Sequence, residues 1–544
     1  MRSPALAIAW EFRQRHRWGL IALAAYLLIL ATFKLLILEP GQSVNLDDAQ
    51  SFALVVVVPL TATFTYCLAL FSFGLAGDLA ARQSMYPARM FTLPVTTAAL
   101  AGWPMLYGTA AMAILWLVTR LLAVWPAGVA VPVIWPALLA AALLAWTQAL
   151  TWMPYGLPGL RVIVAVMWLA VVDAVVLLAL HYQAPEPLMV AILAPHVPLA
   201  YLAARLAVAR ARRGDVPDWR GAFARLAQVA DMLPSRRGHF ASPARAQAWF
   251  EWRRHGWSLP ALVGILLPFE LALLWVAGDT PLVLYILIGV LLTPPFMAAV
   301  AAATVRKSNP QVSDSYGVSP FTATRPLTSA ALIAAKLNMT IWSTLAAWLL
   351  VFLAIPLALS LSDTWPTVME RARRVHDGIG TPRMVVILLL MVSGLIAATW
   401  KQLVQTLYIG LTGREWVVKA SVFLALSVLS LIGPIAQWIS EHGDAQAALW
   451  DALLWIPAVL VSLKMTAAAW TATRLYRSRL LSDRTLVAGA AGWLVAVLAL
   501  YGVLMWLLST PFFPRYLLAL IAILAVPLAR VSAAPLALAW NRHR

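Results

Sequence analysis

Six ionisable side chains lie inside stretches of the chain that are otherwise apolar. They are Lys34, Asp173, Glu270, Lys336, Lys401 and Lys464. A charge at the centre of a bilayer is costly, about 2.5–3.5 kcal/mol on insertion scales, so each is a candidate for a functional role. The lysines have long side chains whose ammonium groups can extend to a membrane interface. Asp173 and Glu270 are too short for this, so we expect them to pair with a neighbouring helix or to serve a substrate or a proton.

Residue combinations that would support enzymatic chemistry are missing from the sequence. No carboxylate pair lies in a loop large enough for a substrate, and no Ser-His-Asp combination converges on one face. The glycine-rich phosphate-binding loop with its Lys and Ser or Thr is absent, so the chain has no ATPase motif. His196 has no second ligand at metal-binding spacing, and Cys67 is the single cysteine. We therefore predict that the chain is not an enzyme and holds no metal or cofactor of its own.

The composition is that of a membrane protein. Of 544 residues, 62% are hydrophobic and 11% are charged, whereas a soluble domain has about a quarter charged. Continuous apolar runs of about 20 residues match a hydrocarbon core about 30 Å thick, which predicts helices and not barrel strands. We expect about 14 transmembrane helices, at 18–38, 52–76, 98–124, 129–152, 161–181, 187–208, 258–277, 281–303, 329–360, 385–408, 416–439, 448–472, 486–508 and 515–538.

The basic residues predict the orientation of these spans. The net charge is +18, but the arginines and lysines cluster between spans, which anionic lipid headgroups explain without nucleic acid. They favour the N-terminal side and the even-numbered connections, most of all between 205 and 237. Both termini are therefore expected in the cytoplasm of a bacterial cell, with the chain in the inner membrane. The exception is the loop at 361–384, which carries arginines on the opposite side and which we interpret as a solvated cap.

The sequence also repeats itself. Trp10-Glu11-Phe12-Arg13 resembles Phe250-Glu251-Trp252-Arg253, and the segment from Leu93 to Leu100 resembles that from Arg325 to Leu332. Trp146 and Gln148 likewise match Trp400 and Gln402. The order of spans keeps both copies in one orientation, so they are parallel repeats. We expect a first six-span half (1–208), a cytoplasmic linker (209–243), a second six-span half (244–480) and two additional spans (481–544).

Two kinds of cytoplasmic segment recur in these halves. Segments rich in Trp, Phe and Arg precede the first and seventh spans, which is typical of an interfacial helix or of an aromatic belt. The connections at 78–94 and 306–326 end in Pro94 and Pro326, each followed by Thr or Ser. Proline suits the first turn of a helix and makes the residue before it extended. The pattern predicts a short surface helix that turns sharply into a long span.

This pattern resembles the permeases of the second, exporter-type class of ABC transporters. The resemblance covers about 1–208 and 244–480, and it includes Lys336 in the first turns of the span after the second proline turn. It implies an interfacial elbow helix in each half and coupling segments, 78–94 and 306–326, that contact two copies of a separate ATPase subunit, which binds the ATP. The residues that it implies at this contact are Arg82, Arg89, Pro94, Arg306, Lys307, Arg325 and Pro326. The additional spans 13 and 14 depart from the family plan.

The resemblance implies a permease subunit that moves an unidentified substrate out of the cytoplasm. The intramembrane candidates are then Asp173, Glu270 and Lys336. An ion- or proton-coupled secondary transporter is the alternative, since it would explain fourteen spans and the buried acids. Against it, corresponding spans of the two halves have no glycine-rich break.

Overall fold

In the computed structural model, the regular secondary structure of the described residues is helical, and no strand occurs among them. These residues are 3–32, 83–122, 132–156, 160–217, 242–277, 282–306, 327–405, 407–412, 442–452, 455–508, 514–527 and 533–542, with single positions at 35, 60, 64, 67, 68, 71, 240, 414, 417, 424, 435 and 439. Contacts divide the chain into a first unit, residues 1–237 with 415–445, and a second unit, residues 238–414 with 446–544.

Nine helical segments within the described ranges are long and apolar enough to cross a membrane. They are α4 (Thr97–Leu122), α5 (Ile134–Trp152), α7 with α8 (Glu186–Leu193 and His196–Arg213), α11 (Ser258–Ala277), α12 (Leu282–Arg306), α14 (Ser329–Leu361), α16 (Thr381–Val404), α20 (Trp455–Arg477) and α21 (Asp483–Leu507). Each coincides with a predicted span, which identifies a multi-pass helical membrane protein. The predicted span at 161–181 is the helix α6 (Leu160–His181). Most of the predicted spans 52–76 and 416–439 lies outside the described residues.

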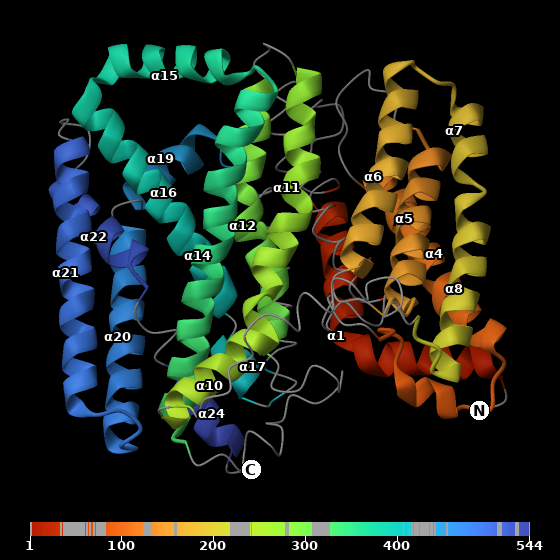
Figure 1. Ribbon diagram of the computed structural model, residues 1–544, viewed down its shortest axis with the longest axis horizontal. Helices are drawn as coiled ribbons and strands as arrows, with labels where there is room; N and C mark the ends of the chain where they lie inside the picture. Colours follow the sequence, from red (N-terminus) through yellow and green to blue (C-terminus); the bar gives the residue numbers. More distant parts are fainter. Residues whose placement is uncertain are drawn as a thin grey trace. The chain divides into compact units, whose positions relative to one another are not determined.

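The first unit is built around α4, α5 and α8. Small residues let α5 and α8 approach closely: Ala141 and Ala145 on α5, and Ala200 and Ala204 on α8, are all buried. α6 and α7 pack against α5. The first part of α1 (Pro4–Thr32) runs horizontally in Figure 1, whereas α6 and α8 of the same unit run vertically. α1 packs against α4, so it lies at a steep angle to the spans of its unit.

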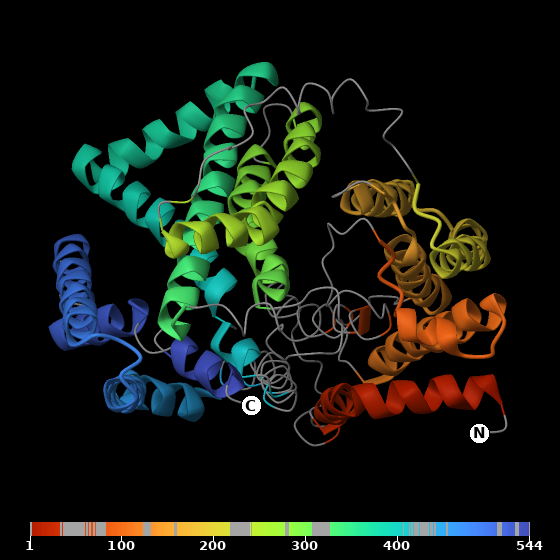
Figure 2. The ribbon, with the colours of Figure 1, turned by 60° about the horizontal axis from the view of Figure 1, so that its bottom comes forward.

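The second unit contains the bundle α11, α12, α14 and α16 and a C-terminal group of three helices, α20, α21 and α22 (Arg515–Ala525). The short helix α10 (Pro243–Glu251) crosses α14 near one end, and α15 (Trp365–Ile379) joins the other end of α14 to α16 (Figures 1 and 2). The short helices α17 (Leu407–Leu411) and α24 (Ala534–Arg542) pack against each other. The η4 segment (Trp252–Gly256) is a π-helical turn between α10 and α11.

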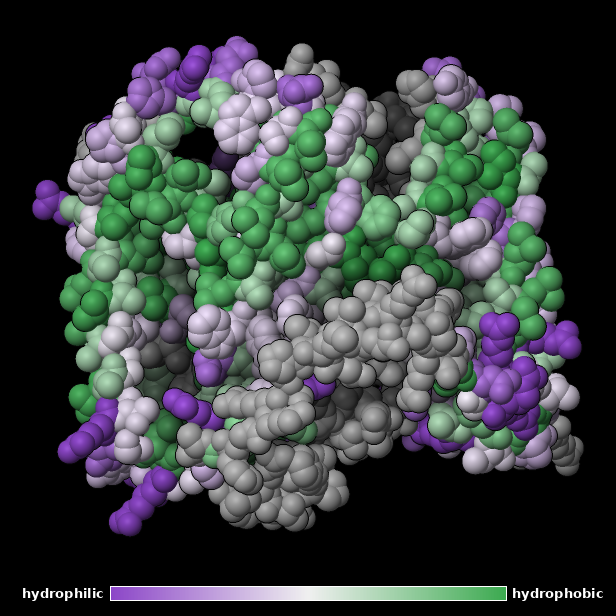
Figure 3. Space-filling model, viewed as in Figure 1, coloured by the Kyte–Doolittle hydropathy of each residue, from purple (hydrophilic) through white to green (hydrophobic). Residues whose placement is uncertain are grey.

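A broad apolar surface covers the outward sides of the second unit. Leu349, Leu353 and Leu357 on α14 and Leu389 on α16 are more than half exposed. Figure 3 shows this apolar surface below the hydrophilic residues that gather over α15. Large exposed aliphatic side chains in such number are unusual for a protein in water and suit contact with lipid.

The predicted last span, 515–538, is not one continuous helix. α22 ends at Ala525, and Val526 is extended. The reason is Pro527, which forces the preceding residue out of the helical conformation and cannot donate a backbone hydrogen bond to the carbonyl of Ile523. The prediction of one continuous helix over 515–538 is therefore wrong.

Candidate functional site

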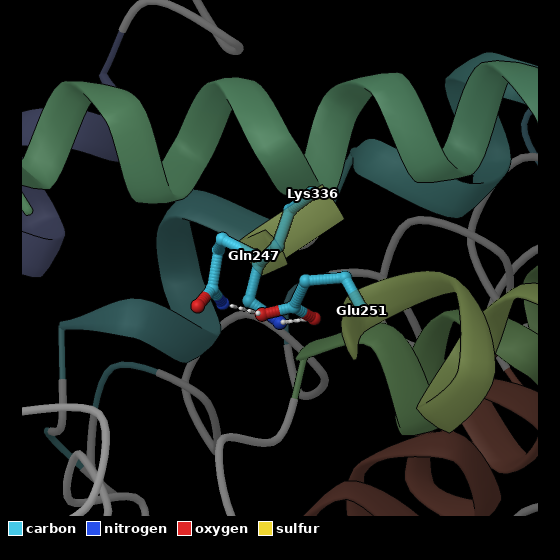
Figure 4. A network of polar contacts seen from close by, with 3 residues as sticks. All are labelled: Gln247, Glu251 and Lys336. Atoms are coloured by element: carbon cyan, nitrogen blue, oxygen red, sulfur yellow. Dashed lines mark hydrogen bonds and ion pairs between the residues drawn. The ribbon is translucent and has the colours of Figure 1, made fainter. Parts of the chain in front are cut away.

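We call the part of α1 around residues 10–13 the first elbow segment, and α10 with η4 (243–256) the second elbow segment. A buried ion pair joins the second elbow segment to α14, the longest helix described in that unit. The Nζ atom of Lys336, the eighth residue of α14, lies 3.0 Å from Oε2 of Glu251 at the end of α10. Gln247 Nε2 donates to Oε1 of the same carboxylate at 2.9 Å (Figure 4). The exposed fractions are 6% for Lys336, 4% for Glu251 and 1% for Gln247. The three side chains therefore form a polar network that is closed to solvent.

Local sequence places these three groups. Gln247 and Glu251 are four residues apart and so lie on one face of α10. α10 begins after Ser242, whose hydroxyl accepts from the Arg245 amide at 3.3 Å. α14 begins after Thr328, whose hydroxyl accepts from the Ala331 amide at 3.2 Å. Both helix starts are fixed by side-chain caps, which sets the register that brings Lys336 to Glu251.

The chain changes direction directly after Glu251. The η4 turn, Trp252–Gly256, has π-helical geometry. This geometry is rare in proteins, and where it does occur it is often at a functional site. A Cβ atom at Gly256 would lie 2.4 Å from the Trp252 ring, so the indole occupies the space that any other residue needs. Ser343 of α14 donates to the Gly256 carbonyl at 2.7 Å. α14 thus binds the elbow segment twice, through Lys336 and through Ser343.

The first unit has a related contact at the matching glutamate. Glu11 of α1 forms an ion pair with Arg89, which lies on the short 3-10 helix η3 (Ala88–Thr92). This pair is more open than Glu251–Lys336, because 49% of the Arg89 side chain and 26% of the Glu11 side chain are exposed. α1 is also bound to α4, because Tyr107 of α4 donates to the Ala5 carbonyl at 3.0 Å. The predicted interfacial segment is therefore attached both to η3 and to the following span.

The described part of the segment 78–94 is a short helix and a sharp turn, as predicted. η3 is followed by Leu93 in an extended conformation, and α4 begins at Thr97 after Pro94. Thr96 accepts from the Ala99 amide at 3.3 Å. Of the other residues implied at an ATPase contact, Arg82, Lys307, Arg325 and Pro326 lie outside the described residues. Arg306 is the last residue of α12, and its side chain is outside them as well.

Tyr86 anchors this turn to the ends of the spans. Its hydroxyl donates to the Leu100 carbonyl at 2.9 Å, and its ring stacks on Phe91 and meets Trp152 edge-on. Burial raises the pKa of Tyr86 well above its usual value, since the phenolate would lose its hydration. Ser84 donates to the Trp152 carbonyl. The turn is thereby attached to α4 and α5.

Two arginines hold the same turn, and the sequence did not identify either of them as a site residue. Arg161 is 1% exposed and donates to the Gln83 carbonyl, and Arg212 of α8 donates to the Val95 carbonyl at 2.9 Å. Burial raises the pKa of Tyr155 to about 12, and the nearby Arg161 guanidinium opposes the shift. Both arginines belong to the basic residues between spans that indicate the orientation of the chain. The isolation of Arg161 between two apolar runs was the available hint of a structural role.

The intramembrane acids occupy separate places. Glu270 is on α11, and the Thr293 hydroxyl of α12 lies 2.6 and 2.8 Å from its two carboxylate oxygens. This contact matches the expected pairing with a neighbouring helix. Thr293 immediately precedes Pro294 and Pro295, which remove two donors from the α12 ladder. Asp173 is on α6, and the surroundings of its side chain lie outside what the structure describes.

The lysines that were expected to extend to an interface differ from one another. Lys336 is buried in its ion pair, so that expectation was wrong for this residue. Lys464 of α20 is half-buried, and its ammonium donates to the carbonyls of Ile523 at 2.6 Å and Leu524 at 3.2 Å, and also to that of Val526. These are the carbonyls at the end of α22, where Pro527 leaves Ile523 without its helical donor. Lys401 is exposed on α16, and Lys34 lies outside the described residues.

His196 makes an interhelical hydrogen bond. It accepts from Trp146 Nε1 at 3.1 Å. The matching tryptophan, Trp400, donates instead to Thr340 of α14 at 3.2 Å. Among the described residues no three His, Cys, Asp or Glu side chains form a group suited to a metal ion.

These polar contacts therefore hold helices together. Acid–base pairs join each elbow segment to a neighbouring element, and Lys464 binds the carbonyl end of α22. No protein-family model, no curated protein and no solved structure matches the chain.

Proposed function

We propose that the chain is the membrane-spanning permease subunit of an ABC-type exporter, working with two copies of a separate ATPase subunit to move a substrate out of the cytoplasm. In this proposal both six-span halves are in one chain of the bacterial inner membrane, and both termini are cytoplasmic. The ATPase binds the ATP, and this chain holds no cofactor. The substrate is left open.

The observation that carries the proposal is that one elbow segment is joined to its coupling segment, through Arg89, and the other to the span that follows its coupling segment, through Lys336. Glu11 and Glu251 occupy matching places in the two sequence repeats, and each meets a base, Arg89 or Lys336. Arg89 is on η3, inside the segment proposed to contact the ATPase. A displacement of that segment would pull directly on α1. Such a linkage suits a protein whose cytoplasmic turns must pass a movement to its spans.

The pairing of Arg89 with Glu11 also makes a sharper test possible. Arg89→Glu reverses a charge at the proposed ATPase contact and breaks the internal pair at once. Glu11→Arg with Arg89→Glu restores an internal pair but keeps the reversed charge on η3. If Arg89 contacts the ATPase, both variants lose ATPase binding, whereas a purely internal role predicts that the exchange restores it.

The measurement is co-purification of the chain with ABC ATPase subunits expressed in the same cells, followed by ATP hydrolysis in proteoliposomes. We expect a complex with two ATPase copies and hydrolysis that depends on this chain. Lys401→Met, a change at an exposed lysine of α16, serves as the matched control. Failure of any ATPase to bind, with transport that needs no ATP, would refute the proposal.

An ion- or proton-coupled secondary transporter is the second candidate. Two observations favour it: Glu270 pairs with Thr293 beside two helix-breaking prolines, and Lys464 occupies the carbonyl end of an interrupted helix. Interrupted helices with exposed carbonyls are common at ion sites of such transporters. Uptake or efflux driven by a pH gradient in ATP-free vesicles would favour this candidate.

A further inference from the structure

α15 is held at the membrane surface by its neighbours in the chain. It follows α14 after residues 362–364, and the single residue Gly380 separates it from α16. His376 Nε2 lies 2.7 Å from Thr381 Oγ1, which joins the end of α15 to the start of α16. α14 and α16 both cross the membrane, and only residues 362–364 and Gly380 connect them to α15. These connections are too short for α15 to lie far from the membrane surface. It lies at the end of α14 opposite to α10 (Figures 1 and 2).

The apolar residues of α15 share one face. At 100° per residue, positions 365, 368, 369, 372, 375 and 379 fall within about a third of the helix circumference. The rest of the chain leaves much of this face open: Trp365 is 44% exposed, Met369 40% and Val375 47%. A large amphipathic helix with Trp on its apolar face, fixed beside two spans, matches helices that lie in the headgroup region with that face in the acyl chains.

The basic residues divide into two groups. Arg374 is on the polar side and pairs with Glu370 four residues earlier, and this contact lowers the pKa of Glu370. Arg371 and Arg373 flank the apolar face on its two sides. Neither is in a hydrogen-bonded ion pair with a residue that the structure describes, and the Arg371 charge adds to the lowering of the pKa of Glu370. Arginines at the borders of an apolar face extend toward lipid phosphates while their stems stay among the acyl chains.

We propose that α15 is a lipid-binding helix: it lies in the membrane interface at the end of α14 remote from α10, with Trp365, Met369 and Val375 in the acyl boundary and Arg371 and Arg373 on phospholipid phosphates. This replaces the solvated cap expected for the loop 361–384. The charge complementarity and the tether to two spans select a lipid surface as the partner, and the inference is independent of the proposed transport function.

The first experiment measures the depth of α15 in a bilayer. Cys67 is the single cysteine of the chain, so Cys67→Ala gives a background for one spin label at a time. Labels at Met369→Cys and Val375→Cys are compared with one at Asp377→Cys, on the polar side, in liposomes of the full-length protein. We expect oxygen to relax the first two labels more strongly, and a water-soluble nickel chelate to relax the third. Equal nickel accessibility at all three sites would overturn the proposal, as would shielding of 369 and 375 from both reagents, which would indicate a protein partner.

The second experiment tests the arginines. The protein is placed in nanodiscs of phosphatidylcholine mixed with phosphatidylglycerol, and the anionic lipid retained by the purified protein is counted by native mass spectrometry. We expect Arg371→Gln with Arg373→Gln to lower the enrichment by on the order of fivefold for each arginine. The matched control Arg374→Gln should leave it unchanged, because Arg374 is engaged by Glu370. An equal effect of the control and the double variant would refute the assignment of the phosphate contacts.

Discussion

Removing the cation from the Lys336–Glu251 pair gives the most direct test of the second unit's architecture. Lys336→Met keeps the length and apolar character of the side chain but leaves the Glu251 carboxylate buried, with the Gln247 amide still donating to it. Breaking a buried pair from one side costs about 3–5 kcal/mol, because the remaining charge has neither water nor counter-ion. We expect Glu251→Gln, which removes the carboxylate from the ammonium instead, to cost a similar amount.

The double variant separates the ion pair from simple packing. With Glu251→Gln and Lys336→Met together, no charge remains buried, and replacement of a buried pair by neutral side chains is often close to neutral. We therefore expect the double variant to lose only about 1–2 kcal/mol, far less than the sum of the single changes. A coupling energy of about 4 kcal/mol or more would follow, larger than usual for residues in contact because each single change removes one member of the buried pair from the other.

The assay is unfolding by sodium dodecyl sulfate in mixed micelles, with hydrogen exchange of the backbone amides of α10 as a local probe. Hydrogen exchange is needed because a chain of two units need not unfold in one step. Lys401→Met is the control and should stay within about 0.5 kcal/mol of the parent protein. Single variants that each lose less than about 1 kcal/mol, with an additive double variant, would show that the pair is not formed and would refute the reasoning.

Three further predictions concern other parts of the chain. Lys464→Met should destabilise the C-terminal group of helices by about 1–3 kcal/mol, because the carbonyls at the end of α22 lose their donor and hydrogen bonds within membrane bundles are worth about 0.6–2 kcal/mol each. Faster hydrogen exchange limited to residues 515–526 would show this loss of stability, and unchanged exchange would contradict the prediction. Glu270→Gln should cost about 1 kcal/mol or less, since Thr293 keeps an acceptor, and should leave transport intact, as should Asp173→Asn; normal folding with abolished transport would instead support proton coupling. Because the pKa of Tyr86 is raised in the folded protein, the unfolded chain ionises this phenol near pH 10 while the folded chain keeps it neutral. The contribution of the Tyr86 hydroxyl to stability is therefore complete below about pH 10 and is lost as pH rises through the folded pKa. The loss of stability between about pH 9 and about pH 11 should be smaller in Tyr86→Phe, and an equal loss in both proteins would contradict the burial of this residue.

The spans were predictable because their signal is local. Length and continuous apolarity placed α14 within one residue of its observed ends, 329–360 against Ser329–Leu361. The proline turn before α4 and the cap at Thr96 also follow from residues adjacent in sequence. Where the prediction of a span failed, at 515–538, the relevant residue, Pro527, was visible but was outweighed by the hydropathy of its surroundings.

The partners of the charged residues were not predictable in the same way. Lys336 and Glu251 are 85 residues apart, and their meeting depends on the crossing of α10 and α14 and on the start of each helix. The expectation that Lys336 would extend to an interface used only the length of its side chain. α15 was missed for another reason: its charges suggested a loop, although the spacing of its apolar residues is helical from Trp365 onward.

The two elbow contacts differ in how firmly they can hold. An exposed pair such as Glu11–Arg89 contributes at most about 1 kcal/mol and weakens with salt, whereas the buried Glu251–Lys336 pair is screened little and is costly to break from one side. The matching glutamates therefore attach α1 weakly to the short helix η3 in the first unit and α10 firmly to the span α14 in the second. In a permease of the proposed kind, the first elbow segment is the one that can follow an ATPase contact, and the second is the one that keeps its span in place. Sequence similarity between the halves thus does not imply equal mechanical roles. The strengths of the two contacts differ because Glu11 pairs with an exposed arginine on η3, whereas Glu251 pairs with a buried lysine on α14.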